Sequence, residues 1–323
     1  MKQNQKHERV FTSSLVRYAI HFGLLSLLAC SMIFYAFAQQ QRPVQRVERQ
    51  QTPKKVGQGA SPVKQAEIAQ INPYSTIFYK SGNLNIEAYL YKPAGNGPFP
   101  LVIYNHGSRQ EHERQENPFR YVAEMLTTNG YAVLVPERRG YGKSDGPTYG
   151  EEVVSAGQPM MHRFEEETDD VLAGLEYIKS TAHDINFKLV ALMGWSHGGV
   201  VSILAASRNH SFVAIINQAG GALTWKHSPE LQTALTQAAR KITVPGLCQD
   251  AENDATTDAV KTVGDAIRVA GNREKTIIYP AFTPTSNPDN IAPGHLIFSR
   301  QGIQIWQDDV LSFLKPIMKP SNT

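Results

Sequence analysis

From residue 74 onward, short apolar runs alternate with segments in which apolar residues recur at helical spacing. Residues 86–91 alternate between apolar and polar side chains, which is typical of an antiparallel strand with one solvated face. Five further runs are apolar at nearly every position, as expected for strands buried on both faces of a parallel sheet. These runs are residues 101–104, 132–135, 189–193, 213–216 and 276–279.

The segments between these runs have the spacing of amphipathic helices. They are residues 119–128, 164–180, 198–207 and 258–270, followed by 310–314. Strand, helix and strand in repetition predict an α/β fold, with a doubly wound, mostly parallel sheet and helices on both faces. Ligands bind such sheets at the carboxyl ends of the strands, so the loops that follow the strands are where we expect chemistry.

Residues 1–38 have the features of an export signal. An apolar stretch at residues 18–37 follows Arg17 and ends in Ala36-Phe37-Ala38, the small-residue pattern that precedes signal cleavage. The stretch is also long enough to span a bilayer, so it predicts either a cleaved signal peptide or a retained membrane anchor. A buried core helix is disfavoured because no polar face interrupts the stretch. We expect an exported protein, periplasmic or secreted, with residues 18–37 as a potential membrane tether.

Residues 39–72 are predicted to be a disordered polar linker, because they are rich in Gln, Pro, Lys and Arg and hold few large apolar residues. Residues 73–323 then form a single folded domain, a length sufficient for one large core. Only two cysteines occur, Cys30 and Cys248. Cleavage of the leader would leave one of them, so we expect no intramolecular disulfide.

The net charge of +3 does not indicate an anionic partner. It is carried entirely by residues 1–38, which hold four basic residues and one acidic residue, and the rest of the chain is neutral. Nucleic acid is therefore not an expected partner. We also expect no metal and no cofactor. His106 and His112 lack helical ligand spacing, and the Gly-x-Gly at residues 140–142 lacks the third glycine of a dinucleotide site.

A candidate nucleophile follows the apolar run at residues 189–193. Residues 194–199 have the sequence Gly-Trp-Ser-His-Gly-Gly and lead directly into a predicted helix. A serine in such a strand–turn–helix is held in a strained, exposed turn, with the next backbone N–H available to an oxyanion. This predicts Ser196 as nucleophile and the N–H of His197 as one oxyanion donor. The alternative is an ordinary glycine-rich turn.

A serine needs a base, and the base needs an acid that fixes its tautomer. His295 lies after the last predicted strand and before the final helix, so it is the expected base. The acid should follow the preceding strand, expected at residues 243–248. Asp254 is the preferred acid and Asp250, which is nearer that strand, is the alternative. Glu252 and Asp258 also follow the strand.

The second oxyanion donor is expected in the loop after residues 101–104. Gly107 allows a tight turn there, and the N–H of Ser108 is the expected donor, with that of Arg109 as the alternative. The next strand is followed at residues 137–144 by Glu-Arg-Arg-Gly-Tyr-Gly-Lys-Ser. Its arginines could bind an acidic group of the substrate, or they could pair with acids beneath the site, which we favour.

These motifs together resemble the α/β-hydrolase superfamily, and within it the dienelactone-hydrolase-like and prolyl-oligopeptidase-like branch. The resemblance spans about residues 80 to 315 and includes the sequence Ala-Glu-Asn-Asp that ends at Asp254. It implies hydrolysis of esters, lactones or peptides through an acyl-enzyme, without a cofactor. Dienelactone hydrolases proper use a cysteine nucleophile, and Ser196 stands in that position here. Dienelactone itself is therefore a doubtful substrate.

The leading expectation is a serine esterase acting on a small ester through Ser196, Asp254 and His295. The first alternative is an exported peptidase acting on short peptides. A non-catalytic binding protein with a hydrolase fold is less favoured because the sequence retains all three residues. The sequence does not specify the substrate.

Overall fold

A computed structural model describes residues 74–108 and 119–319. The predicted export signal, the cleavage point after Ala38, the linker at residues 39–72 and the alternative donor Arg109 lie outside these residues. None of the helices in the described part combines the length and the apolar character needed to cross a bilayer.

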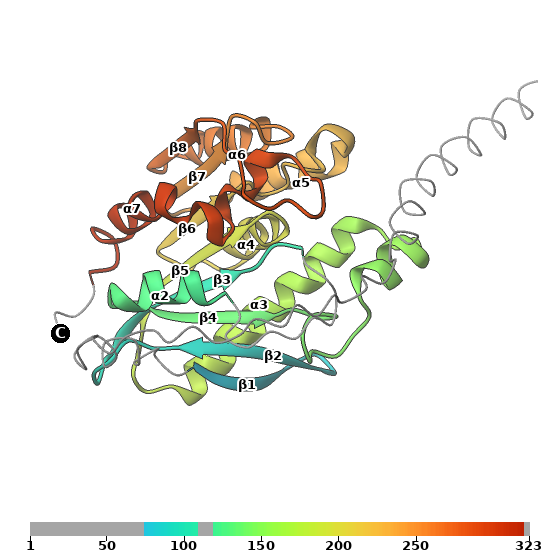
Figure 1. Ribbon diagram of the computed structural model, residues 1–323. Helices are drawn as coiled ribbons and strands as arrows, with labels where there is room; N and C mark the ends of the chain where they lie inside the picture. The colour runs from blue at the N-terminus through green and yellow to red at the C-terminus, as the bar shows by residue number, and fades with distance from the viewer. Residues whose placement is uncertain (1–73, 109–118, 320–323) are drawn as a thin grey trace, which may run out of the picture. The chain divides into compact units, whose positions relative to one another are not determined.

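The core of the fold is an eight-stranded sheet with the order β1-β2-β4-β3-β5-β6-β7-β8 (Figure 1). The two pairings β1–β2 and β2–β4 are antiparallel, and the strands from β4 to β8 run parallel. The strands are β1 (Tyr74–Ser81), β2 (Leu84–Tyr91), β3 (Phe99–Asn105), β4 (Ala132–Glu137), β5 (Ile185–Trp195), β6 (Ala214–Gln218), β7 (Gly246–Ala251) and β8 (Glu274–Tyr279).

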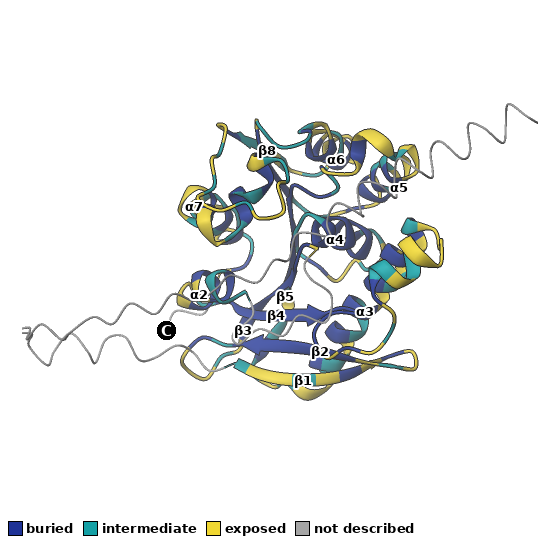
Figure 2. Ribbon diagram, turned by 45° about the vertical axis from the view of Figure 1, so that its right-hand side comes forward, coloured by how far each residue is buried: buried dark blue, intermediate teal, exposed yellow. Residues whose placement is uncertain are grey.

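Helices cover both faces of the sheet (Figure 2). One apolar cluster joins the sheet to α3, α4, α5 and α6, and a second joins the other face to α2 and α7. The helices are α2 (Arg120–Thr128), α3 (Met160–Thr181), α4 (His197–Arg208), α5 (Pro229–Ala239), α6 (Asp258–Val269) and α7 (Ile303–Leu314). The predicted doubly wound α/β fold is confirmed.

Of these strands and α-helices, two were not predicted, one strand was placed wrongly, and α7 begins at Ile303, seven residues before its predicted start. β1 and α5 were missed because neither has a clear apolar periodicity: only two residues of β1 are buried, and α5 is rich in Thr, Gln and Ala. The strand expected at residues 243–248 is β7, which begins three residues later at Gly246. The error arose because the strand ends in buried polar residues, Gln249 and Asp250, which we had assigned to the following loop.

The parallel register aligns the carboxyl ends of the central strands. Asn105 of β3 lies opposite Gly194 of β5, and Gly194 lies opposite Asn217 of β6. The loops after β3, β5, β7 and β8 therefore open at one edge of the sheet, where this topology places ligand sites.

Candidate active site

Ser196 occupies a sharp turn between β5 and α4. Its φ of 56° and ψ of −119° are unfavourable for a residue with a side chain. Close packing enforces the turn: a Cβ at Gly198 would lie 1.9 Å from the carbonyl oxygen of Asn105, and one at Gly194 would lie 2.2 Å from that of Gly198. Glycine at these positions lets α4 approach β3 and leaves Ser196 at the strand end, as the sequence pattern predicted.

The structure brings Ser196, His295 and Asp254 together. The His295 Nε2 atom lies 2.8 Å from Ser196 Oγ, and His295 Nδ1 lies 2.7 Å from Asp254 Oδ2. The side chain of Asp254 is fully buried. A carboxylate at Nδ1 favours the tautomer with its proton there, which leaves Nε2 free to accept the proton of the serine hydroxyl. This is the geometry that an activated serine requires.

The loop that carries His295 is fixed on both sides. The indole N–H of Trp195, the residue before the nucleophile, donates to the His295 carbonyl oxygen at 3.1 Å. The N–H of Gly294 donates to the carbonyl of Asn253, 3.2 Å away, in the loop of the acid. On the far side, the Trp306 indole of α7 donates to Ile297 at 2.9 Å. Contacts to the end of β5, to the loop of the acid and to α7 therefore set the position of the imidazole.

The residues predicted to supply the two oxyanion donors, His197 and Ser108, lie near the serine in the structure. His197 is the first residue of α4, where the N–H groups of the first turn have no partner within the helix. Gly107 packs against the nucleophile, since a Cβ there would be 3.3 Å from the Cβ of Ser196. The next residue, Ser108, has its hydroxyl 3.4 Å from His197 Nδ1. The loop after β3 and the first turn of α4 therefore both lie next to Ser196.

A buried charge network lies beneath the site, and its central acid, Glu167, was not predicted from the sequence. Glu167 of α3 is fully buried and accepts hydrogen bonds from Arg138 Nε at 2.6 Å, Arg163 Nε at 2.8 Å and His197 Nε2 at 2.7 Å. Arg138 also donates to the backbone carbonyl of His106 at 2.9 Å. One carboxylate therefore connects the loops after β3 and β4 to the first residue of α4.

The network sets the ionisation of its members. Burial alone would raise the pKa of Glu167, but His197, Arg138 and Arg163 outweigh it and hold that pKa well below its ordinary value. Burial also lowers the pKa of His197, although Glu167 opposes the shift. We conclude that Glu167 is ionised and that His197 carries a proton on Nε2, which lies 2.7 Å from the carboxylate. Its Nδ1 faces the Ser108 hydroxyl.

The arginines of residues 137–144 pair with acids, as our favoured interpretation of that loop expected. Arg138 is bound to Glu167, and Arg139 Nη2 lies 2.9 Å from Asp170 Oδ1. A signal for Glu167 was present in the sequence: it lies on the same helical face as Phe164 and Val171, both buried. An acid within an apolar stripe indicates a buried partner.

Asp250, the alternative acid, does not contact His295 through any recorded hydrogen bond of the described residues. It lies within β7 and is fully buried, and its Oδ1 accepts the N–H of Ala251 at 2.8 Å. Glu252 and Asp258 are exposed.

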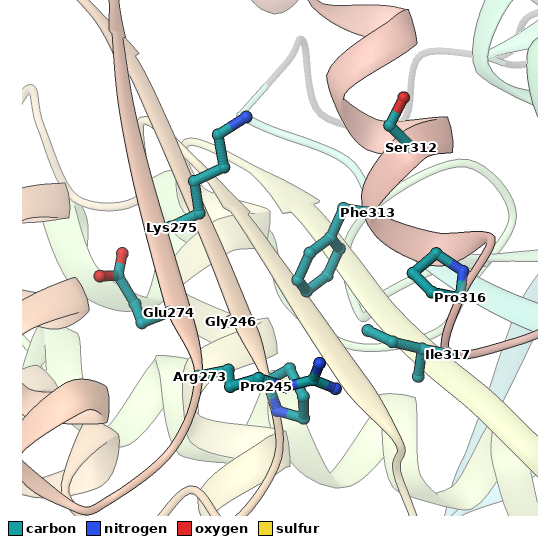
Figure 3. Close-up of a pocket in the computed structure, with 9 residues that line it drawn as sticks. All are labelled: Pro245, Gly246, Arg273, Glu274, Lys275, Ser312, Phe313, Pro316 and Ile317. Atoms are coloured by element: carbon teal, nitrogen blue, oxygen red, sulfur yellow. The ribbon is translucent and has the colours of Figure 1, made fainter.

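A separate groove of about 260 Å³ lies at the opposite edge of the sheet (Figure 3). It is bordered by Gly246 and Glu274, the first residues of β7 and β8, and by Phe313 of α7. Because Ser196 follows the carboxyl end of a parallel strand, this groove is remote from the candidate site. Within the described ranges, no group of three or more His, Cys, Asp or Glu side chains is arranged to hold a metal ion.

The amino-acid sequence is similar to a known protein family and to a bacterial protein. Residues 98–244 match the family described as serine aminopeptidase, S33. The quorum-quenching protein AidA of Acinetobacter baumannii is 26% identical over 143 residues, which are 44% of this chain and 42% of that protein. The match therefore covers less than half the length of this relative.

Solved structures share the fold at low sequence identity. Acylaminoacyl peptidase of Pyrococcus horikoshii has a TM-score of 0.60 at 15% identity, over 83% of this chain and 46% of that chain. Dienelactone hydrolase of Anabaena variabilis has a TM-score of 0.54 at 16% identity, over 76% of this chain and 99% of that chain. Together with the sheet order and the family match, these similarities confirm the fold that the motifs indicated: the chain has the α/β-hydrolase fold and is similar in sequence to a serine hydrolase family.

Proposed function

We propose that this protein is a serine hydrolase that cleaves a carboxylic ester, or a related acyl bond, through an acyl-enzyme on Ser196. The observation that carries the proposal is the pair of contacts made by His295, 2.8 Å to Ser196 Oγ and 2.7 Å to Asp254 Oδ2. An imidazole held between a hydroxyl and a buried carboxylate is suited to general-base activation of that hydroxyl.

The first step is acylation. His295 Nε2 takes the hydroxyl proton while Ser196 Oγ bonds to the acyl carbon, and the carbonyl oxygen becomes an oxyanion. The backbone N–H groups of His197 and Ser108 are the proposed donors to that oxyanion. The tetrahedral intermediate collapses when the bond to the leaving oxygen breaks, and His295 returns the proton to the leaving alcohol. Water then attacks the acyl-serine by the same route, which releases the acid and restores the hydroxyl.

Two considerations favour an ester over a peptide bond. The match to a dienelactone hydrolase covers nearly all of that protein, and a lactone is a cyclic ester. The match to acylaminoacyl peptidase covers less than half of that chain, so most of the peptidase has no counterpart here. A peptidase acting on short peptides remains the second candidate, because the matching family is described as serine aminopeptidase and one structural neighbour is a peptidase. We expect a small ester or a short peptide as partner and no nucleic acid.

The test compares substrates and one substitution in the purified protein. We expect turnover of acyl esters of graded chain length, with aminoacyl amides cleaved more slowly. Ser196→Ala should lower ester turnover by about 10⁴-fold or more and abolish labelling by a fluorophosphonate. Ser207→Ala is the matched control on α4, because its hydroxyl only donates to the Leu204 carbonyl. A Ser196→Ala protein with near wild-type turnover would refute the proposal, and faster cleavage of amides would favour the peptidase.

We also propose that the protein is exported, through residues 1–38. The support is the basic leader, the apolar stretch at residues 18–37 and the Ala-x-Ala ending at Ala38.

A further inference from the structure

Asp250 is a buried carboxyl group that the proposed mechanism does not use. Its residue is 0% exposed at the end of β7. One carboxyl oxygen, Oδ1, accepts the N–H of Ala251 at 2.8 Å. The other, Oδ2, is enclosed by protein and receives no hydrogen bond from a donor among the described residues. An ionised carboxylate in this position would lack most of the donors that a buried charge needs.

After β7 the chain forms a turn that brings the carboxyl group of Asp254 next to that of Asp250. The N–H of Asp254 donates to the carbonyl of Ala251 at 3.0 Å, which closes the turn. The turn brings the Asp254 carboxyl group close enough for its charge to act on Asp250, whose Oδ2 has no hydrogen-bond partner among the described residues. Two carboxylates have no proton to share, so a hydrogen bond between them requires that one of the two be protonated.

The surroundings decide which carboxyl group carries the proton. Asp254 accepts the Ala255 N–H at 2.6 Å and faces His295 Nδ1 at 2.7 Å, so its oxygens have two donors already. Asp250 has a single backbone donor. Burial, and next the charge of Asp254, raise the pKa of Asp250 to about 9, although Lys261 of α6 acts in the opposite direction.

We propose that Asp250 is a positioning residue that stays protonated. Its O–H donates a hydrogen bond to the carboxylate of Asp254 and so holds that carboxylate in place for His295. This inference rests on the proposed hydrolase function. With the third donor in place, hydrogen bonds from the Ala255 backbone, the imidazole and the Asp250 carboxyl group all bear on Asp254. A rotation of Asp254 would then break more than its contact to the base. Asp250 contacts neither the substrate nor the reacting atoms, and it acts only through Asp254.

The proposal predicts a specific effect of pH. The charged or titratable groups that act on Asp250 are Asp254 in the following loop and Lys261 on α6, while its register partner on β8 is the apolar Ile278. When Asp250 loses its proton, Asp254 loses a donor and gains a neighbouring negative charge. His295 is then held less well, so turnover should fall as the pH rises through about 9.

Three variants test the role by kinetics across pH. Asp250→Asn keeps a neutral donor, so turnover at neutral pH should stay within about tenfold of wild type and the fall near pH 9 should disappear. Asp250→Ala removes the donor and should lower kcat by about 10- to 100-fold with little change in KM. The control is Glu252→Gln, an exposed acid of the same loop, which should keep both turnover and the alkaline fall. An unchanged alkaline fall in Asp250→Asn, or a loss as large as that of Asp254→Asn, would overturn the proposal.

A second measurement does not depend on activity. The carboxyl carbon of Asp250 can be titrated by NMR in the full Ser196→Ala chain with ¹³C-labelled aspartate, assigned by comparison with Asp250→Asn. We expect one carboxyl group to titrate near pH 9 and to be absent from Asp250→Asn. Titration near the ordinary value of 3.8 would overturn the proposal even if the enzyme hydrolyses esters. If wild type hydrolyses no acyl substrate although the proton is retained, the proposed function fails and the positioning role fails with it, while the shared proton stands.

Discussion

Replacement of Glu167 by Gln should strongly destabilise the protein, because Glu167 is the shared counter-charge of the buried network. The change keeps the size of the side chain but removes the negative charge that faces Arg138 and Arg163. An amide also presents its own N–H₂ group to donors that need an acceptor. Arg163 keeps Glu152 at 2.5 Å, whereas Arg138, 0% exposed, keeps as hydrogen-bond acceptor only a backbone carbonyl among the described residues.

The size of the expected destabilisation follows from the burial of the arginine charges that remain. Removal of one partner from a buried ion pair costs about 3–5 kcal/mol, because the remaining charge stays desolvated. For a domain of this size, each kcal/mol lowers the melting temperature by about 2–4 °C. The expected loss is therefore roughly 6–20 °C at neutral pH. The folded-state pKa of Glu167 is lowered, so its stabilising contribution is present above the ordinary carboxyl pKa of 4.5 and disappears as the pH falls through the folded value.

The assay is thermal unfolding of wild type and variants at several pH values. Asp169→Asn is the matched control: it lies on the same helix, removes one carboxylate and loses an exposed pair with Arg208. Exposed pairs contribute about 0–1 kcal/mol, so the control should melt within about 4 °C of wild type. Equal melting temperatures for Glu167→Gln and Asp169→Asn at pH 7 would refute the reasoning, as would a difference from wild type that grows in acid.

Four further predictions follow from the sequence and the geometry. Asp254→Asn should lower ester turnover by about 10⁴-fold with affinity retained, because the amide favours the wrong imidazole tautomer; a mild loss in steady-state kinetics would move the acid elsewhere. Gly198→Ala should fold poorly or melt far below wild type in a thermal scan, because its Cβ would lie 1.9 Å from a backbone oxygen; a near wild-type melting temperature would contradict the packing. Burial raises the pKa of the Cys248 thiol, so in a Cys30→Ser chain a disulfide reagent should react only after denaturation, and rapid native labelling would count against the buried position. N-terminal sequencing should find either a mature chain that starts at Gln39 in the exported fraction or an uncleaved chain in the membrane fraction; full-length protein free in the cytosol would exclude both.

The strands that could be predicted from the sequence are those whose central positions are all buried among apolar side chains. Strands such as β3 and β4 are buried on both faces, so their central positions are apolar and the run is unambiguous. β7 was misplaced because burial at its end is satisfied by hydrogen bonds instead of apolar contact. Gln249 donates to the Tyr279 hydroxyl at 2.6 Å, and such a partner cannot be identified from a local pattern.

Some residues of the candidate site could likewise be predicted from the sequence, and others could not. Ser196, Asp254 and His295 could be selected because each follows a strand, and chain order reflects the topology. Glu167 was not selected because two of its three partners, Arg138 and His197, come from other segments of the chain. Hydrogen bonds between residues 29 and 30 positions apart cannot be read from a local pattern, although the position of Glu167 within an apolar stripe indicates a buried partner. The protonation of Asp250 is similarly inaccessible, because it depends on a turn that places two acids in contact.

Two residues of the site lie far apart along the chain, so the ribosome makes them at different times. Ser196 and His295 are 99 residues apart, and the His295 loop is fixed by α7, which follows it. At a synthesis rate of roughly 5–20 residues per second, the serine is made roughly 5–20 s before its partner. During that interval a nascent chain carries the hydroxyl without its imidazole. A product that terminates before Trp306 would lack the indole that anchors this loop, so a truncated chain should accumulate as inactive protein even though Ser196 and Asp254 are present.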